Sequence, residues 1–276
     1  MKLVAGIQAF EEEDFIEPCV RSLCDLCDVV VVVEGGWKTT NAIAAKTSRD
    51  KTNEILNGLI EELENLMVFH KYDSENQIVH RQWIWETCKL LGPDWYLQGD
   101  GDEIFHESDM DTIRNTLEGV SNMTNDPMVA LAPDHCLFWN DLVHCQKWNT
   151  AGARFFNVPK DQEIYAGPNC NMMHNGQKTH HRLVCEHFNI FHPTYSKNIK
   201  RQKVKFEHRK QDDGRPLKHE IINGEFMAPN KPDKIEWFTS MDKKDKSELP
   251  KYFHNNRLFG VDVESRFIDA CNKHYA

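Results

Sequence analysis

The chain has 276 residues, of which 40% are hydrophobic, and this is enough material for one large domain. Its 43 acidic and 33 basic residues give a formal charge of −10, which argues against a general nucleic-acid binder. No apolar run approaches the roughly 20 residues of a membrane span, so no membrane-spanning segment is expected.

Apolar segments alternate with helical patterns over the first hundred residues. Residues 3–10 predict a buried strand, and five consecutive valines before Glu34 predict a central strand that is covered on both faces. The expected strands are 3–10, 29–36, 67–73 and 94–103, and the expected helices between them are 11–27, 50–66 and 76–91. This order predicts an α/β fold with a mostly parallel central sheet and helices on both faces.

The pattern becomes less regular after Asp102. A short helix is expected at 108–120, with further strands at 127–139, 153–159 and 183–193. The remaining segments are a basic helix at 195–211, a polar region at 212–251 and a last helix at 263–275. Nine irregularly spaced cysteines favour a reducing compartment and hence a cytoplasmic location, and the CxxC pair Cys24 and Cys27 is expected on a helix facing the core.

Carboxylates gather where the fourth predicted strand ends. In "WYLQGDGDEIF", residues 95–105, an apolar strand leads directly into Asp100, Asp102 and Glu103. An Asp-x-Asp pair at a strand end binds a hard divalent cation, supplies acid–base catalysis, or forms a solvated turn. Ligands of parallel sheets bind outside the carboxyl ends of the strands, where Glu34 also lies.

Several segments together resemble a family 2-type glycosyltransferase of the GT-A fold. The resemblance covers residues 2–105 well and 150–210 more loosely, and it rests on the order and spacing of the segments. They are "KLVAGIQAFEEEDFIEPCVRSL", "CDVVVVVEGG", "SRDKTNEIL" with its Ser-x-Asp-x-Thr pattern, the Asp-x-Asp segment, "RFFNVPKDQEIYAG" and "FNIFHPTYSKNIKRQKVKFE".

The resemblance implies a metal-dependent transferase of the hexosyltransferase type, which moves a sugar from a nucleotide-diphosphate donor to an acceptor hydroxyl with inversion. A UDP-sugar is the favoured donor, and a glycan or glycoconjugate is the expected acceptor. Mn²⁺ or Mg²⁺ would neutralise the departing diphosphate. The implied metal site is Asp100, Asp102 and His192, with Asp102 as the direct ligand and Asp100 on the ribose or on metal-bound water. The histidine nitrogen favours Mn²⁺, and Asp102 is expected to be exposed in the metal-free protein.

Further residues are expected to contact the donor. Glu34 would accept hydrogen bonds from the ribose or base, and Asp50 would do likewise or would cap the helix that follows it. Gly101, which has no Cβ, would let the backbone turn closely beneath the phosphates. The resemblance places Arg81 at the donor, with a surface ion pair as the alternative. The full set of donor-site candidates is Gln8, Ala9, Phe10, Glu34, Asp50, Arg81, Asp100, Gly101, Lys197 and Lys203.

The catalytic base is left open. An inverting transfer needs a group that deprotonates the acceptor hydroxyl, and His174 lacks the following Glu that resembling proteins often show. Asp134, Glu163 and Glu186 are the candidates, with Asp134 and Glu186 ranked equally, and Glu186 shares a face with His192 if the strand alternates strictly.

Two other functions remain open. A nucleotidyltransferase-type enzyme of related fold usually has a Gly-rich first loop, which "QAFEEEDF" lacks. An inactive sugar-nucleotide binding module would not need an intact Asp-x-Asp motif. The expected organisation is a catalytic domain at 1–210 and an extension at 211–276 packed on it. Within the domain, 1–105 would bind the nucleotide sugar and 106–210 the acceptor.

Overall fold

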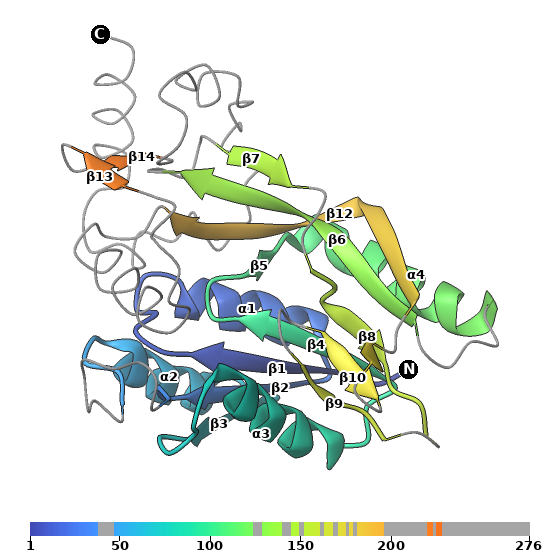
Figure 1. The fold of residues 1–276 in the computed structure, drawn as a ribbon, viewed down its shortest axis with the longest axis horizontal. Coiled ribbons are helices and arrows are strands. Elements are labelled where there is room, and N and C mark those ends of the chain that lie inside the picture. The colour runs from blue at the N-terminus through green and yellow to red at the C-terminus, as the bar shows by residue number, and fades with distance from the viewer. Residues whose placement is uncertain are drawn as a thin grey trace, which may run out of the picture.

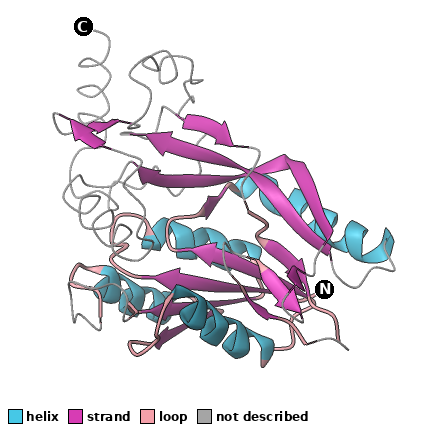
Figure 2. Cartoon of the chain, in the orientation of Figure 1, coloured by secondary structure: helices cyan, strands magenta, loops and turns pink. Residues whose placement is uncertain are grey.

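A computed structural model shows how the chain folds (Figures 1 and 2). It describes residues 1–37, 47–123, 129–139, 145–148, 152–160, 163–167, 171–174, 177–178, 181–195, 220–222 and 225–227. Among these residues, no helix has both the length and the apolar character needed to cross a membrane.

The first four strands form a parallel sheet, as the sequence predicts. They are β1 (Leu3–Ala9), β2 (Val29–Glu34), β3 (Leu66–His70) and β4 (Trp95–Asp100), in the spatial order β3-β2-β1-β4. Val4 of β1 lies opposite Val29 of β2 on one side and Tyr96 of β4 on the other. All four strands therefore place their carboxyl ends at one edge of the sheet.

Helices cover both faces of this sheet, which confirms the expected fold class. They are α1 (Ile16–Leu26), α2 (Thr52–Glu62), α3 (Gln77–Lys89) and α4 (Met110–Met123), the last preceded by the 3₁₀ turn η1 (Glu107–Asp109). The first two helices and α4 pack on one face, whereas α3 packs on the other. The strands first run outward in the order β1, β2, β3. The chain then passes over the other face as α3, and β4 pairs with the opposite side of β1, so the order of the strands reverses between β1 and β4. Such a switch point is where ligands of open α/β sheets bind.

The second half of the chain extends the sheet with mixed pairing. Its strands are β5 (Ile104–Phe105), β6 (Val129–Trp139), β7 (Cys145–Trp148), β8 (Phe155–Asn157) and β12 (His181–Tyr195). The sheet continues as β4-β8-β6-β12-β5, with β7 on β6; among these described strands β6 and β12 pair in parallel and the other pairs are antiparallel. A small sheet contains β9 (Tyr165–Ala166), β10 (Met172–His174) and β11 (Gln177–Lys178), and β13 (Glu220–Ile222) pairs with β14 (Glu225–Met227).

Aromatic side chains fill the core on both faces of the sheet. On the α3 face, the rings of Trp85 and Tyr96 lie 5.0 Å apart. On the opposite face, Phe155 packs edge-on against Phe105 and Phe188, with ring centroids 5.9 and 5.8 Å away. The second half of the chain is thereby joined to the first by a continuous apolar core.

Several predicted boundaries differ from the structure. The helix expected at 50–66 begins at Thr52, and Lys51 rather than Asp50 is its N-cap residue. Asp50 instead accepts a hydrogen bond from the Thr52 amide at 3.0 Å. Tyr195 ends β12, and both the rest of the expected basic helix at 195–211 and the last helix at 263–275 lie outside the described residues. Cys24 and Cys27 are free thiols packed at the core, as expected.

Candidate functional site

The site is built around the turn that follows β4. Glu103 N–H donates to the Asp100 carbonyl at 3.1 Å and closes a tight turn over Gly101 and Asp102. Gly101 N–H donates to the Gln8 carbonyl at 3.0 Å, and a Cβ on Gly101 would lie 3.2 Å from Cγ of Glu12. This glycine therefore lets the turn pack closely against the end of β1. We call residues 100–103 the acidic turn.

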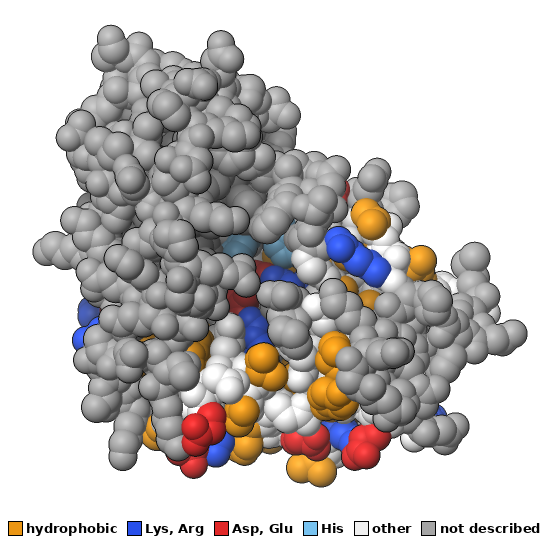
Figure 3. Space-filling model, viewed as in Figure 1, with side chains coloured by type: hydrophobic (Ala, Val, Ile, Leu, Met, Phe, Trp, Pro, Cys, Tyr) orange, Lys and Arg blue, Asp and Glu red, His pale blue; other side chains and the backbone are white. Residues whose placement is uncertain are grey.

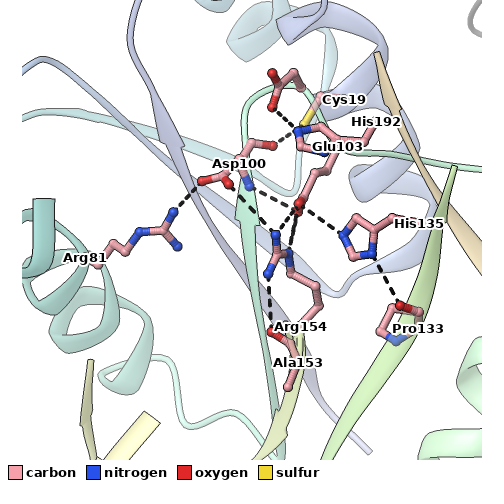
Figure 4. A network of polar contacts seen from close by, with 10 residues as sticks. Cys19, Arg81, Asp100, Glu103, Pro133, His135, Ala153, Arg154 and His192 are labelled. Atoms are coloured by element: carbon pink, nitrogen blue, oxygen red, sulfur yellow. Dashed lines mark hydrogen bonds and ion pairs between the residues drawn. The ribbon is translucent and has the colours of Figure 1, made fainter. Parts of the chain in front are cut away.

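Two arginines compensate the charge of Asp100. Arg81 of α3 donates from Nη2 to Asp100 Oδ1 at 2.6 Å, and Nη2 of Arg154 lies 3.9 Å from Asp100 Oδ2 (Figure 4). Arg81 is buried, with only 7% of its side chain exposed, so it does not form the surface ion pair that was the alternative for this residue. It lies at the carboxyl edge of the sheet, beside the acidic turn.

The acidic turn also meets His192 of β12, which is 90 residues away in sequence. Nε2 of His192 lies 3.2 Å from Oδ1 of Asp102. The expectation that Asp102 is exposed without metal is wrong, because only 1% of the residue is accessible. Its position between the packed end of β1 and the strand β12 covers it.

Glu103, Arg154 and His135 form a buried cluster beneath the turn that the sequence analysis did not identify. Arg154 donates from Nε to both carboxylate oxygens of Glu103, at 2.9 and 2.8 Å, and from Nη2 to Oε1 at 2.5 Å. Nε2 of His135 lies 3.4 Å from Glu103 Oε1. Burial alone would raise the pKa of Glu103, but Arg154 and His135 together bring it well below its ordinary value.

Both ring nitrogens of His135 face acceptors. Nδ1 lies 3.3 Å from the carbonyl of Pro133, and Nε2 faces Glu103. Burial lowers the pKa of His135, and the positive charge of Arg154 adds to this lowering, while the contacts with Glu103 act in the opposite direction; the net result is a lowered pKa. The ring is therefore neutral at pH 7, and only one of the two contacts is a hydrogen bond at a time.

Acidic side chains outnumber basic ones around the acidic turn. Arg81 and Arg154 pair with Asp100, Arg154 also pairs with Glu103, and Asp102 contacts His192. These three carboxylates and two guanidinium groups carry a net charge of −1 when the histidines are neutral. In Figure 3, histidine, acidic and basic side chains meet near the middle of the face shown.

A divalent cation fits the donor atoms present at Asp102. Its carboxylate and the imidazole of His192 offer oxygen and nitrogen to the same point, a mixed set that suits Mn²⁺. Within the described ranges, however, no three His, Cys, Asp or Glu side chains are gathered as a metal-binding group. The Asp100 carboxylate turns toward Arg81 (Figure 4), whereas the Asp102 carboxylate contacts His192.

Two other donor-site candidates already have partners within the protein. Glu34 is fully buried and accepts from the Ser48 amide at 2.6 Å, and its Oε2 lies 3.1 Å from Nδ1 of His70. Asp50 accepts from the amide and hydroxyl of Thr52 with one oxygen, and from the Glu13 amide with the other. Their roles toward a donor remain predictions, and both first hold together neighbouring segments.

The remaining candidates divide by position. Gln8 and Ala9 lie at the carboxyl end of β1 and Phe10 follows them, beside the acidic turn. Asp134 is fully buried on β6 and lies opposite Asn189 of β12. The pairing of β6 with β12 shifts register between Cys185 and Asn189, so strict alternation from Glu186 to His192 does not hold. The side chains of Glu186, Lys197 and Lys203 lie outside the described residues.

Comparisons with known proteins give only a distant similarity of fold. No protein-family profile matches the chain, and no curated protein sequence matches it. The crystal structure of S. aureus TarS 1–349 in complex with UDP is 14% identical, covers 77% of this chain and 67% of that chain, and has a TM-score of 0.43. The crystal structure of TarS 1–349 with UDP-GlcNAc is 13% identical, covers 99% and 80% of the two chains, and has a TM-score of 0.41.

Proposed function

We propose that the protein is a metal-dependent glycosyltransferase of the hexosyltransferase type, which uses a nucleoside-diphosphate sugar as donor, with a UDP-sugar favoured. The observation that carries this proposal is the position of the acidic turn. It lies at the switch point between β1 and β4, and His192 approaches Asp102 there from the far end of the sheet. The resemblance of the sequence segments to family 2-type glycosyltransferases supports the same function.

The side chains of the site supply charges of both signs to a diphosphate. Asp102 and His192 would hold Mn²⁺ or Mg²⁺, with Asp100 reaching the ion, its water or the ribose. The bound ion supplies positive charge to the departing diphosphate. Arg81 contributes a fixed positive charge at the same edge, and its burial keeps the guanidinium in place.

The transfer proceeds by direct attack with inversion in this proposal. The acceptor hydroxyl of a glycan or glycoconjugate forms a bond to the anomeric carbon while the bond from that carbon to the diphosphate oxygen breaks. The hydroxyl proton goes to a carboxylate base. Asp134 and Glu186 are both kept as candidates: Asp134 is fully buried on β6, and the side chain of Glu186 lies outside the described residues. Proton NMR of the product tests inversion, since retention of the donor anomer would exclude this mechanism.

Calorimetric titration of UDP with Mn²⁺ and with chelator tests the donor and metal roles. The wild type should bind UDP far more tightly with Mn²⁺, whereas Asp102→Asn and His192→Ala should lose most of this difference. His106→Ala is a matched control, because the His106 ring packs 5.9 Å from Phe191, next to His192, yet its Nδ1 meets Ser108 rather than the acidic turn. Equal UDP affinity of the wild type with chelator and with Mn²⁺ would remove the metal from the proposal.

A further inference from the structure

Glu103 closes the acidic turn through both its backbone and its side chain. Its own backbone N–H closes the turn on the Asp100 carbonyl, and its side-chain Oε2 accepts from the Asp100 amide at 3.3 Å. The side chain is 1% exposed, so it offers nothing to a ligand in solvent. Glu103 therefore restrains the backbone between Asp100 and Asp102.

Arg154 anchors this carboxylate to the rest of the sheet. Its backbone is held on both sides, since its N–H donates to Leu131 of β6 at 3.0 Å and its carbonyl accepts from Gln98 of β4 at 2.9 Å. Its guanidinium donates to Glu103 through two nitrogens and also lies near Asp100 (Figure 4). One rigid arginine thus touches the first and last residues of the turn.

His135 connects the same carboxylate to the other candidate ligand. Its Nε2 lies 3.4 Å from Glu103, and its ring stands edge-on to the ring of His192 with centroids 6.0 Å apart. His192 in turn reaches Asp102. The cluster therefore contacts both elements that carry the proposed metal ligands, namely the acidic turn and β12.

From these contacts we infer that Arg154, Glu103 and His135 are positioning residues for the proposed metal-binding pair Asp102 and His192. They hold the acidic turn in the conformation that aims Asp102 at His192, and they do not themselves touch donor or metal. The expected effect on metal binding rests on the proposed function. The structural part of the inference, the rigidity of the turn, is independent of that function.

Replacement of Arg154 tests the inference with two separate readouts. In Arg154→Met the amides of the acidic turn should exchange hydrogen about tenfold faster, measured by mass spectrometry of peptides spanning residues 100–103, because the anchor is gone. The affinity for UDP in the presence of Mn²⁺ should fall about 10- to 100-fold, the usual effect of removing a support of a metal ligand. Arg154→Lys keeps the charge without the two-pronged contact and should show a smaller loss.

The double variant Arg154→Met/Glu103→Gln keeps the test decisive if the single variant does not fold. It removes the uncompensated buried charge, so stability should recover, while the guanidinium anchor remains absent. The double variant should still show faster hydrogen exchange at the acidic turn and weaker affinity for UDP in the presence of Mn²⁺. Arg114→Met is the matched control, because Arg114 also bridges chain segments, from α4 to Leu26 and Asp28, but lies away from the turn.

The possible results separate the two proposals. Wild-type exchange at the turn in the Arg154 variants, or faster exchange with unchanged affinity for UDP and Mn²⁺, would overturn the positioning role. If the wild type binds no UDP with Mn²⁺ while turn exchange still rises in the variants, the proposed function fails and the anchoring of the turn stands.

Discussion

His80 is a buried imidazole on α3, next to the arginine that contacts Asp100. It is fully buried, and Nδ1 lies 3.3 Å from the Ser74 hydroxyl. Burial lowers its pKa to about 4, whereas an unfolded chain titrates near 6.5. Between these values the unfolded state binds the extra proton, so the free energy of unfolding falls as the pH drops from 6.5 to 4. The stability that comes from keeping His80 neutral is therefore fully present above pH 6.5.

The predicted size of this effect is up to about 3 kcal/mol across the window, and about 2 kcal/mol by pH 5. Urea unfolding of the wild type and His80→Phe at pH 7.5 and pH 5.0 measures it. The wild type should lose about 2 kcal/mol more than the variant between the two pH values, because phenylalanine takes up no proton. Equal losses would mean that His80 does not titrate in this way.

Residues with strong local signals were predictable at the site, and residues defined by tertiary contact were not. Asp100 and Asp102 follow an apolar strand, and His192 lies in a segment that resembles a known family. Arg154 has only a weak signal, a lone cation immediately before the aromatic pair of "ARFFNVP". Its partner Glu103 is 51 residues earlier, and no local periodicity reports a pairing over that distance.

At the scale of elements, the first residue of α2 and the segment before it hold the turn after β1 through side-chain oxygens. Three alternate side chains accept hydrogen bonds from three consecutive backbone N–H groups. Ser48 accepts from Glu11 at 2.9 Å, Thr52 from Glu12 at 2.8 Å, and Asp50 from Glu13 at 3.1 Å. Glu11 has a φ of 53°, a left-handed conformation that is uncommon for a residue other than glycine. These bonds satisfy the backbone donors of the turn before α1 and keep that conformation in place.

Thr52 is the buried member of this set and gives its clearest test. Thr52→Val preserves the shape but leaves the Glu12 amide without its acceptor, and such a loss costs about 1–3 kcal/mol in a buried place. Thr52→Ser retains the hydroxyl and should cost less than half as much. Urea denaturation of both variants measures the difference, and equal stability of the two would show that the hydroxyl contributes nothing.

This network also explains why the predicted boundary of α2 was wrong. Asp50 is a good N-cap residue by type, and the sequence alone assigns it to the helix that follows. In the folded chain its second oxygen bonds the Glu13 amide instead, and Lys51 occupies the cap position. The strands and helices of the first half were predictable because their apolar periodicity is strong, whereas their ends depend on contacts between segments.

At the scale of the whole molecule, the path of the chain brings the site together. The parallel half contributes the carboxyl ends of β1 and β4, and the mixed half returns through β6 and β12 to deliver His135 and His192. Alternating apolar segments predict the first half, but the sequence does not specify that β8 and β6 lie between β4 and β12. Pairings between strands far apart in sequence depend on tertiary packing, which short windows of sequence do not contain.

Ligand linkage tests this assembly as a whole. With a site charge of −1, UDP alone should bind weakly and Mn²⁺ alone modestly, so each should raise the melting temperature little. Together they should stabilise more than the sum of both, because the cation offsets repulsion between carboxylates and diphosphate. At about a hundred times the dissociation constant the gain is roughly 2.7 kcal/mol, a shift of about 5 °C. Scanning calorimetry of the wild type and Asp102→Asn measures it. The variant should lose the excess while keeping any effect of UDP alone, and strictly additive effects in the wild type would show that metal and nucleotide bind apart.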